Sequence, residues 1–447
     1  MIGWFLDRMD EAPTREALVW RERAVTYGEL RRTVRIAAER LRKAGVTTGS
    51  VVSLEGDYSP GAVALLLALV DAGAIVVPLT ASVEQSKPDF RRIAEVGFVV
   101  RLSEDDAWTI EPTGIQATHP LIQALRDRGH PGIIVFSSGS TGFPKAAIHD
   151  FVPLFEKFKP RRHSLRTLTF LLLDHLGGIN TLLYILSNLG TVVTVARRDP
   201  DSVCEAIARH RVELLPTSPT FLNLMLLSEA HTRHDLSSLV QVSYGTEPMP
   251  ESTLRRVHEI FPNVKLLQTY GLSELGVLRS KSKSSDSLWV KVGGEGFETK
   301  VHGGTLWIRA QSSILGYLNA PSPFDAEGWM DTGDEVLVDG EYLRFLGRRS
   351  EIINVGGEKV YPAEVESILL EMDGILDAAV RGEKNPITGM MVVARLTVAD
   401  SSDAANLRVR VRAFCKDRLS PFKVPAKVEV TVDPLHSGRF KRLRRGD

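Results

Sequence analysis

Residues 26–80 alternate between helical and strand patterns, and this alternation limits the folds open to the chain. Thr26 is a typical N-cap before a helical pattern that extends to about Lys43. The β-branched run at 51–54 predicts a strand, and the apolar residues 61–79 predict a buried helix, a turn and a second strand. Because helices that alternate with strands form parallel sheets, this region predicts an α/β fold.

The size and charge of the chain exclude several classes of protein. A chain of 447 residues is too long for one core and suggests two or three domains. The 55 basic and 55 acidic residues cancel, whereas a nucleic-acid-binding protein would carry a basic excess. We therefore expect no nucleic-acid partner.

Cysteine usage and apolar runs bear on location. Cys204 and Cys415 are the only cysteines, which makes no disulfide framework or metal cluster and predicts a cytoplasmic protein. The apolar start at 2–6 is too short for a signal peptide. Polar residues or turn signals interrupt both longer apolar stretches, 61–79 and 168–195, so we expect no membrane span.

A hydroxyl- and glycine-rich loop follows the predicted strand 133–136. Its residues are Ser137, Ser138, Gly139, Ser140, Thr141, Gly142, Phe143, Pro144 and Lys145. Such a loop offers backbone and hydroxyl donors to an anion, and the lysine adds a positive charge, so a phosphate is a suitable ligand. A P-loop of the nucleotide triphosphatase type is excluded by the spacing of the two glycines and by Ala146 after the lysine. Taken alone, the loop would more often be an ordinary surface loop.

Further motifs place the loop in a larger pattern. These motifs are Gly245-Thr246-Glu247-Pro248, Tyr270-Gly271-Leu272-Ser273-Glu274, Asp331-Thr332-Gly333-Asp334, and Gly347-Arg348 through Gly356-Gly357-Glu358-Lys359. Together with the loop they resemble, in order, the signatures of the acyl-adenylate-forming ligases, which include acyl- and aryl-CoA synthetases, nonribosomal peptide adenylation domains and luciferases. With the loop, they make five ordered motifs across nearly the whole chain, which is a specific signal where one motif would be weak.

The resemblance implies a two-domain enzyme. Residues 1–348 would form a large N-terminal AMP-binding domain of α/β subdomains and a small β subdomain. Residues 349–447 would form a mobile α+β lid, whose pattern predicts helices at 362–371 and 404–418 and strands at 375–381, 390–398 and 426–432. Ser350 falls at the hinge, where relatives usually have Asp or Lys.

The resemblance also assigns roles to the motif residues. ATP would be bound by the loop 137–142 with Lys145, by the turn 245–248, by Tyr270, Gly271 and Ser273, and by Asp334 and Arg348 at the ribose. Glu274 would hold Mg²⁺, an ion that prefers hard oxygen ligands. Gly356, Gly357 and Lys359 would line a passage for a pantetheine thiol. Thr141, Glu274 and His175 are the catalytic candidates in the large domain.

The acyl pocket is expected around residues 171–178, read as a strand that ends at a pocket. In the resemblance His175 faces the substrate carboxylate, and Leu176 falls where amino-acid-activating relatives have Asp. An α-amino acid is then disfavoured, because its ammonium would be buried unpaired. A two-residue slip of the alignment would give Asp174 the role of amine partner, and a simple core histidine at 175 is the other alternative.

The C-terminal turn departs from the family pattern. Relatives have a Ser-Gly-Lys turn whose lysine contacts the acyl carboxylate and the α-phosphate. Here Arg439 occupies the lysine position and Lys441 lies two residues on, so both are catalytic candidates. Both side chains would point the same way if the turn continued as a strand. A solvated basic tail is the alternative.

The implied reaction has two halves. A carboxylic acid, aryl or aliphatic in our interpretation, would react with ATP to give an acyl-AMP and pyrophosphate. The acyl group would then pass to a pantetheine thiol, with CoA favoured. Two alternatives remain open from the sequence: an adenylase that loads the phosphopantetheine of an acyl carrier protein, and a nucleotide-binding paralogue without catalytic activity.

Overall fold

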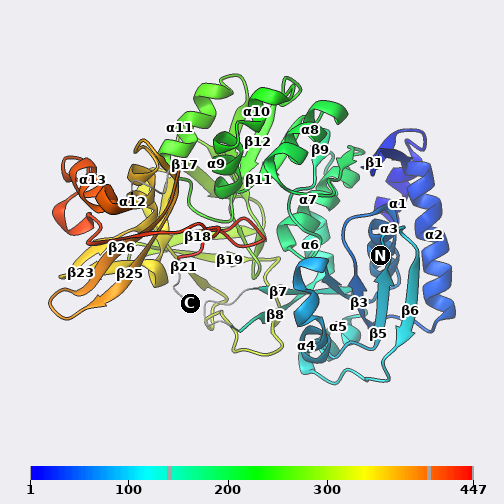
Figure 1. Ribbon diagram of the computed structural model, residues 1–447. Helices are drawn as coiled ribbons and strands as arrows, with labels where there is room; N and C mark the ends of the chain where they lie inside the picture. Colours follow the sequence, from blue (N-terminus) through cyan, green and yellow to red (C-terminus); the bar gives the residue numbers. More distant parts are fainter. Residues whose placement is uncertain (1, 138–142, 400–403, 445–447) are drawn as a thin grey trace.

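The computed structural model describes residues 2–137, 143–399 and 404–444, and it divides into a large N-terminal domain and a small C-terminal one. In Figure 1 the small domain, in orange, lies at the opposite end of the molecule from the blue N-terminal helices. The predicted mixed α/β architecture is confirmed. Three larger sheets build the N-terminal domain and a fourth builds the C-terminal domain.

The first sheet has the order β20-β8-β7-β4-β3-β5-β6, and its central strands are parallel. Its strands are β3 (Val51–Glu55), β4 (Ile75–Leu79), β5 (Phe98–Leu102), β6 (Trp108–Pro112), β7 (Gly132–Ser137), β8 (Lys145–Asp150) and β20 (Gly316–Tyr317). The helices that connect or cover them are α2 (Tyr27–Lys43), α3 (Pro60–Asp71), α4 (Lys87–Ile93) and α5 (Pro120–Arg128), with the 3-10 turn η1 (Ala81–Ser86).

The local signals read from the sequence form these elements. Thr26 and Glu29 make a reciprocal capping box at the start of α2, which satisfies N–H groups that the first helical turn leaves unpaired. Helix α3 is buried on all sides, and Gly73 (φ +75°) makes the turn into β4 in the left-handed region that favours glycine. The predicted helix, turn and strand of residues 61–79 are therefore confirmed.

The second sheet has the order β13-β12-β11-β9-β10-β1-β2, parallel except for the β1–β2 hairpin. Its strands are β1 (Glu16–Trp20), β2 (Arg23–Thr26), β9 (Thr167–Leu168), β10 (Val192–Val193), β11 (Leu214–Thr217), β12 (Gln241–Tyr244) and β13 (Lys265–Gln268). Its helices are α7 (Leu176–Ser187), α8 (Pro200–His210), α9 (Pro219–Leu227), α10 (Ala230–Arg233) and α11 (Glu251–Ile260); α1 (Gly3–Asp10) and α6 (Phe151–Glu156) lie nearer the first sheet.

A six-stranded antiparallel sheet, β16-β17-β22-β21-β19-β18, forms the predicted small β subdomain. Its strands are β16 (Arg279–Ser282), β17 (Trp289–Gly293), β18 (Phe297–His302), β19 (Thr305–Ala310), β21 (Met330–Asp339) and β22 (Tyr342–Arg348). The short hairpin of β14 (Gly271–Leu272) and β15 (Gly276–Val277) connects it to the second sheet.

The strands of the fourth sheet follow β22, across the short turn η2 (Arg349–Glu351). The sheet of this C-terminal domain consists of β23 (Ile353–Val355), β24 (Glu358–Val360), β25 (Ile375–Asn385), β26 (Gly389–Val398) and β27 (Lys427–Val430), with helices α12 (Pro362–Leu369) and α13 (Ala404–Lys416) and the 3-10 turn η4 (Pro421–Lys423). Each helix and strand predicted here is present, within a few residues at its ends. The domain has its own apolar core.

One local expectation was wrong. Residues 171–173 are not a strand, because β9 ends at Leu168 and the chain then turns toward His175, the N-cap of α7. Cys204 and Cys415 are both buried free thiols. In the part of the chain that the structure describes, helices are too short or too polar to span a bilayer.

His149 connects two layers of the large domain. It lies in β8, is fully buried, and its Nε2 donates to the backbone oxygen of Ser273 at 2.7 Å. Burial lowers the pKa of His149 to about 4, so the ring stays neutral in the folded protein over a pH range in which the unfolded chain binds a proton.

We therefore predict a loss of stability on mild acidification that depends on His149. Because the pKa is lowered on folding, its stabilising contribution is present above pH 6.5 and declines toward pH 4. At pH 5 the loss from this group should be about 2 kcal/mol. Thermal unfolding of the wild type and of His149→Gln at pH 7 and pH 5 tests this; an equal downward shift in both proteins would contradict it.

Candidate active site

Three of the predicted motifs follow the carboxyl end of a strand. The loop 137–145 follows β7, the turn 245–248 follows β12, and the segment 270–274 follows β13. The carboxyl ends of parallel strands are the usual place for a ligand in an open α/β sheet. Ser138, Gly139, Ser140, Thr141 and Gly142 lie outside the described residues.

The base of the predicted phosphate loop is a strand pair. Ser137 and Lys145 are register partners in the antiparallel β7–β8 hairpin. Asn319 fixes the second strand, since its side chain accepts from the Ala146 N–H and donates to the Pro144 oxygen, both at 2.9 Å. A P-loop is followed by a helix, so the strand β8 after this loop also excludes that alternative.

Lys145, Tyr317 and Glu274 form one group. The Lys145 ammonium lies 5.2 Å from the centre of the Tyr317 ring, and the Tyr317 hydroxyl donates to Glu274 Oε1 at 2.5 Å. The sequence motifs did not include Tyr317. It arrives from β20, which pairs with β8, and no local pattern signals this long-range pairing.

A second group surrounds Asp334 in the small β subdomain. The β21–β22 register places Arg348 opposite Asp334, with 3.4 Å between Nε and Oδ1. The Tyr270 hydroxyl donates to Asp334 Oδ2 at 2.6 Å, and the Tyr270 ring stacks on Phe345 at 4.6 Å between centroids. Burial raises the pKa of Asp334, while Arg348 and the Tyr270 hydrogen bond oppose that rise.

The turn after β12 is tightly packed. A Cβ on Gly245 would lie 2.6 Å from the backbone oxygen of Thr269, so only glycine fits there. Thr246 is exposed with φ +73°, and Glu247 points back into the protein. Glu247 accepts from the backbone N–H of Thr220 at 2.8 Å and from that of Arg442 at 2.9 Å. It therefore holds the C-terminal tail against the start of α9.

The C-terminal tail, residues 436–444, reaches into this edge of the large domain. Figure 1 shows it in red, running from the small domain back over the large one. The Phe440 ring packs against Phe170 and Phe221, and its backbone oxygen accepts from the Ser218 hydroxyl at 2.8 Å. The tail is therefore packed on the large domain and is not the solvated basic tail that was the alternative.

The tail does not continue as a strand, so the condition under which Arg439 and Lys441 would point the same way is not met. Ser437 and Lys441 close a tight turn in which Phe440 has φ +54°. Arg439 pairs with Asp174 at 2.9 Å. Burial and the Arg348 cation lower the pKa of Lys441, against the opposing pull of Glu247 and Glu274. Lys441 therefore lies within electrostatic range of both groups described above.

His175 caps α7 and faces the tail. Its Nδ1 accepts from the Gly177 N–H at 3.1 Å, so the other ring nitrogen, Nε2, carries the hydrogen. Desolvation, helped by the cations of Lys441 and Arg439, lowers the pKa of His175 to about 3. The ring is therefore a neutral donor. Leu176 is buried in the core beside it, and Asp174 is occupied by Arg439.

The residues of the predicted thiol passage lie apart from this site. Gly356 (φ +59°) and Gly357 (φ +93°) form the exposed tip of the β23–β24 hairpin. Lys359 pairs with Glu335 of the β subdomain at 2.8 Å, and Ser350 lies in η2. The structure thus docks the tail on the large domain and leaves the glycine hairpin exposed.

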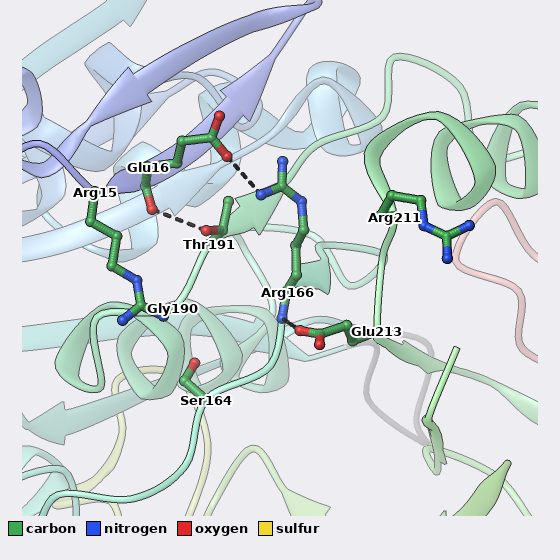
Figure 2. Close-up of a pocket in the computed structure, with 8 residues that line it drawn as sticks. All are labelled: Arg15, Glu16, Ser164, Arg166, Gly190, Thr191, Arg211 and Glu213. Atoms are coloured by element: carbon green, nitrogen blue, oxygen red, sulfur yellow. Dashed lines mark hydrogen bonds and ion pairs between the residues drawn. The ribbon is translucent and has the colours of Figure 1, made fainter. Parts of the chain in front are cut away.

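A cavity of about 400 Å³ lies at the opposite edge of the second sheet, near the amino ends of β1, β9 and β11 (Figure 2). Two of its acidic side chains have partners: Glu16 forms an ion pair with the Arg166 guanidinium at 2.6 Å, and Glu213 accepts from the backbone N–H of Arg166 at 2.7 Å. None of the predicted site residues lines this cavity, and we do not assign it to the active site.

Comparisons with known proteins agree with this geometry. The family model "AMP-binding enzyme" matches residues 5–95 and 83–318, and the model "AMP-binding enzyme C-terminal domain" matches residues 364–438. An indoleacetate–CoA ligase of Aromatoleum aromaticum is 29% identical, over 97% of this chain and 94% of that protein. A 2-succinylbenzoate–CoA ligase of Bacillus subtilis is 27% identical, over 99% of this chain and 96% of that protein.

A solved structure of an anthranilate CoA ligase in complex with anthranoyl-AMP has the same fold. It superposes with a TM-score of 0.81 at 20% identity, over 98% of this chain and 95% of that one. The two family models together cover most of the sequence, and the fold agrees over nearly its full length. The chain therefore belongs to the AMP-binding enzyme family and is an AMP-forming ligase of the acyl-CoA synthetase-like kind.

Proposed function

We propose that this enzyme activates an aryl or aliphatic carboxylic acid with ATP and transfers the acyl group to the thiol of CoA. The observation that carries the proposal is the docked tail, which contacts Glu247, Ser218 and Asp174 of the large domain. In this position Lys441 is under the electrostatic influence of Glu274, Glu247 and Arg348. A cation at this point would offset charge between a substrate carboxylate and the α-phosphate. Loading of an acyl carrier protein is the alternative for the second step.

The first half-reaction is an in-line displacement at phosphorus. An oxygen of the substrate carboxylate forms a bond to the α-phosphorus, the bond to the bridging oxygen breaks, and pyrophosphate leaves with that electron pair. Little covalent chemistry is required of the protein, so positioning and electrostatics carry the catalysis. His175, neutral with its Nε2 hydrogen, would donate to the substrate carboxylate without adding another positive charge.

The nucleotide would lie across the two groups of the site. Asp334 has the acceptor capacity for ribose hydroxyls beyond its bonds to Tyr270 and Arg348, and the Tyr270 ring lies beside it for the purine. The remaining contacts to the nucleotide would come from Thr141 and its loop and from Ser137, Lys145, Gly245, Thr246, Pro248, Gly271 and Ser273. Lys145 would contribute a charge to the phosphates.

The residues present fit a magnesium ion. Glu274 offers a hard carboxylate oxygen fixed by Tyr317, and among the described residues no group of three or more His, Cys, Asp or Glu forms a closed metal cage. A single protein carboxylate with phosphate oxygens is a common arrangement for Mg²⁺. When bound, the ion would neutralise phosphate charge in the transition state.

We propose that the described arrangement serves the first half-reaction. For the second, we propose that the C-terminal domain, from residue 349 onward, rotates about Ser350 and brings Gly356, Gly357 and Lys359 to the acyl group. This motion would break the Lys359–Glu335 pair. The CoA sulfur would then attack the acyl carbon, and AMP would leave with the carbon–oxygen bonding electrons.

Several contacts support the substrate class. Phe170 and Phe221 lie beside the tail, Leu176 is buried, and Asp174 is neutralised by Arg439, so an α-ammonium group would lack a free carboxylate partner. The two reported relatives are named for aromatic acids and for CoA. The two buried free thiols agree with a cytoplasmic location.

A pyrophosphate-release screen over aryl, fatty and amino acids, with and without CoA, tests the proposed function. We expect turnover with an aryl or aliphatic acid, stimulated by CoA, and none with α-amino acids. Robust exchange with an amino acid that Asp174→Asn abolishes would overturn the substrate class. Turnover that requires a carrier protein in place of CoA would favour the alternative acceptor.

Glu274→Gln should lower acyl-AMP formation by roughly a hundredfold or more, the scale of losing one transition-state stabiliser. The amide keeps a hydrogen-bond acceptor for Tyr317 but loses the charge that holds magnesium. Pyrophosphate exchange as a function of magnesium concentration measures the effect. Near-wild-type activity at limiting magnesium would show that Glu274 has only a structural role.

Lys441→Ala should reduce acyl-AMP formation by roughly a hundredfold or more, while Arg439→Ala has the smaller effect. Glu247, Glu274 and Arg348 act electrostatically on Lys441, whereas Asp174 holds the Arg439 guanidinium. Thioester formation from preformed acyl-AMP should remain near wild type for Lys441→Ala, because the tail would have left the site. Single-turnover assays of each half-reaction separate the two steps; a larger loss for Arg439→Ala would reverse the assignment.

A further inference from the structure

Asp174 forms a nearly buried ion pair with the C-terminal tail. Its side chain is 4% exposed, and Oδ2 lies 2.9 Å from Arg439 Nη2. Thr80 donates to the same oxygen at 2.7 Å, and the Ser82 hydroxyl lies 3.4 Å away. A carboxylate in such surroundings is costly without a positive partner, so the pair should strongly favour the docked position of the tail.

The other two arginines of the described tail, Arg442 and Arg444, pair with carboxylates on the C-terminal side of the molecule. Arg442 pairs with Asp377, and Arg444 pairs with Glu366 and Glu351, all at or beyond the boundary of the C-terminal domain. These pairs would travel with that domain in any rotation. Among the described tail residues, Arg439 is the arginine that forms an ion pair with the large domain.

The geometry of the turn connects Arg439 to Lys441. The Ser437 N–H donates to the Lys441 oxygen at 2.9 Å, and the Phe440 N–H donates to the Ser437 oxygen at 2.9 Å. Such a closed turn moves as a unit, so fixing the Arg439 side chain at Asp174 also fixes where the Lys441 backbone lies. Arg198 adds a hydrogen bond to the Gly438 oxygen at 3.1 Å.

We infer that Asp174 is a positioning residue for the first half-reaction: it holds Arg439, and through the turn it sets Lys441 at the reacting phosphate. Arg439 thus stands at the position of the family lysine but acts as an anchor, and the catalytic cation is two residues later. This inference rests on the proposed function for its catalytic consequence. The anchoring contact itself can be tested without any substrate.

The first experiment measures hydrogen exchange of residues 436–443 in the ligand-free enzyme. In Asp174→Asn, exchange of this segment should quicken roughly tenfold or more, as expected once a buried ion pair loses one charge. Arg439→Gln should do the same, and it alters the tail without touching the core of the large domain. Asp201→Asn, which breaks the exposed Asp201–Arg233 pair, is the matched control and should leave tail exchange unchanged.

The second experiment measures the two half-reactions. Asp174→Asn should slow acyl-AMP formation by roughly tenfold or more and leave thioester formation from preformed acyl-AMP unchanged. The double variant with Arg439→Gln should be no slower than either single variant, because both remove one contact. Arg439→Lys should retain the acyl-AMP formation that Arg439→Gln loses, since an ammonium can also pair with Asp174.

The outcomes separate the claim that Asp174 anchors the tail from the proposed function of the enzyme. Unchanged tail exchange in both Asp174→Asn and Arg439→Gln overturns the anchor, whatever the activities are. Equal losses in both half-reactions also overturn it, because they indicate a general structural defect. Quickened tail exchange together with a selective loss of acyl-AMP formation supports it. A wild type that releases no pyrophosphate with any acid contradicts the proposed function, and the exchange result still decides whether the anchor exists.

Discussion

Docking of the C-terminal tail is the interaction on which the site depends, because it places Lys441 under the electrostatic influence of Glu247, Glu274 and Arg348. The contacts that hold the tail include the Asp174–Arg439 ion pair, aromatic packing around Phe440, and hydrogen bonds that use backbone groups of the tail. Contacts of this kind hold a defined geometry and can still be broken as a unit when a domain moves.

The rest of the site is built on rigid elements. Strand ends and one antiparallel register fix Asp334, Arg348 and Tyr270, and a long-range strand pair fixes Tyr317 against Glu274. Electrostatic catalysis requires such preorganised groups, because groups that must reorient during the reaction lose most of their effect. The neutral His175 fits this arrangement, since another cation would repel Lys441.

Most of the architecture could be predicted from local signals. The capped helix α2, the buried α3 with its glycine turn, and the order of elements in the C-terminal domain follow from periodicity, caps and turn residues, which act over a few positions. The strand expected at 171–173 failed because tertiary packing overrode a short apolar run there. Such runs do not distinguish a strand from a turn leading into a helix cap.

The sequence by itself determined the family pattern and which residue types are available: the hydroxyl-rich loop, the carboxylates Glu274 and Asp334, and two candidate cations near the C-terminus. Only the tertiary structure decided how the two cations differ. Arg439 and Lys441 are equivalent in charge and close in sequence, but a left-handed residue between them sends one to Asp174 and leaves the other near Glu274. Charge is a local property of a residue, whereas the carboxylate that it meets depends on contacts between segments that lie far apart in the chain.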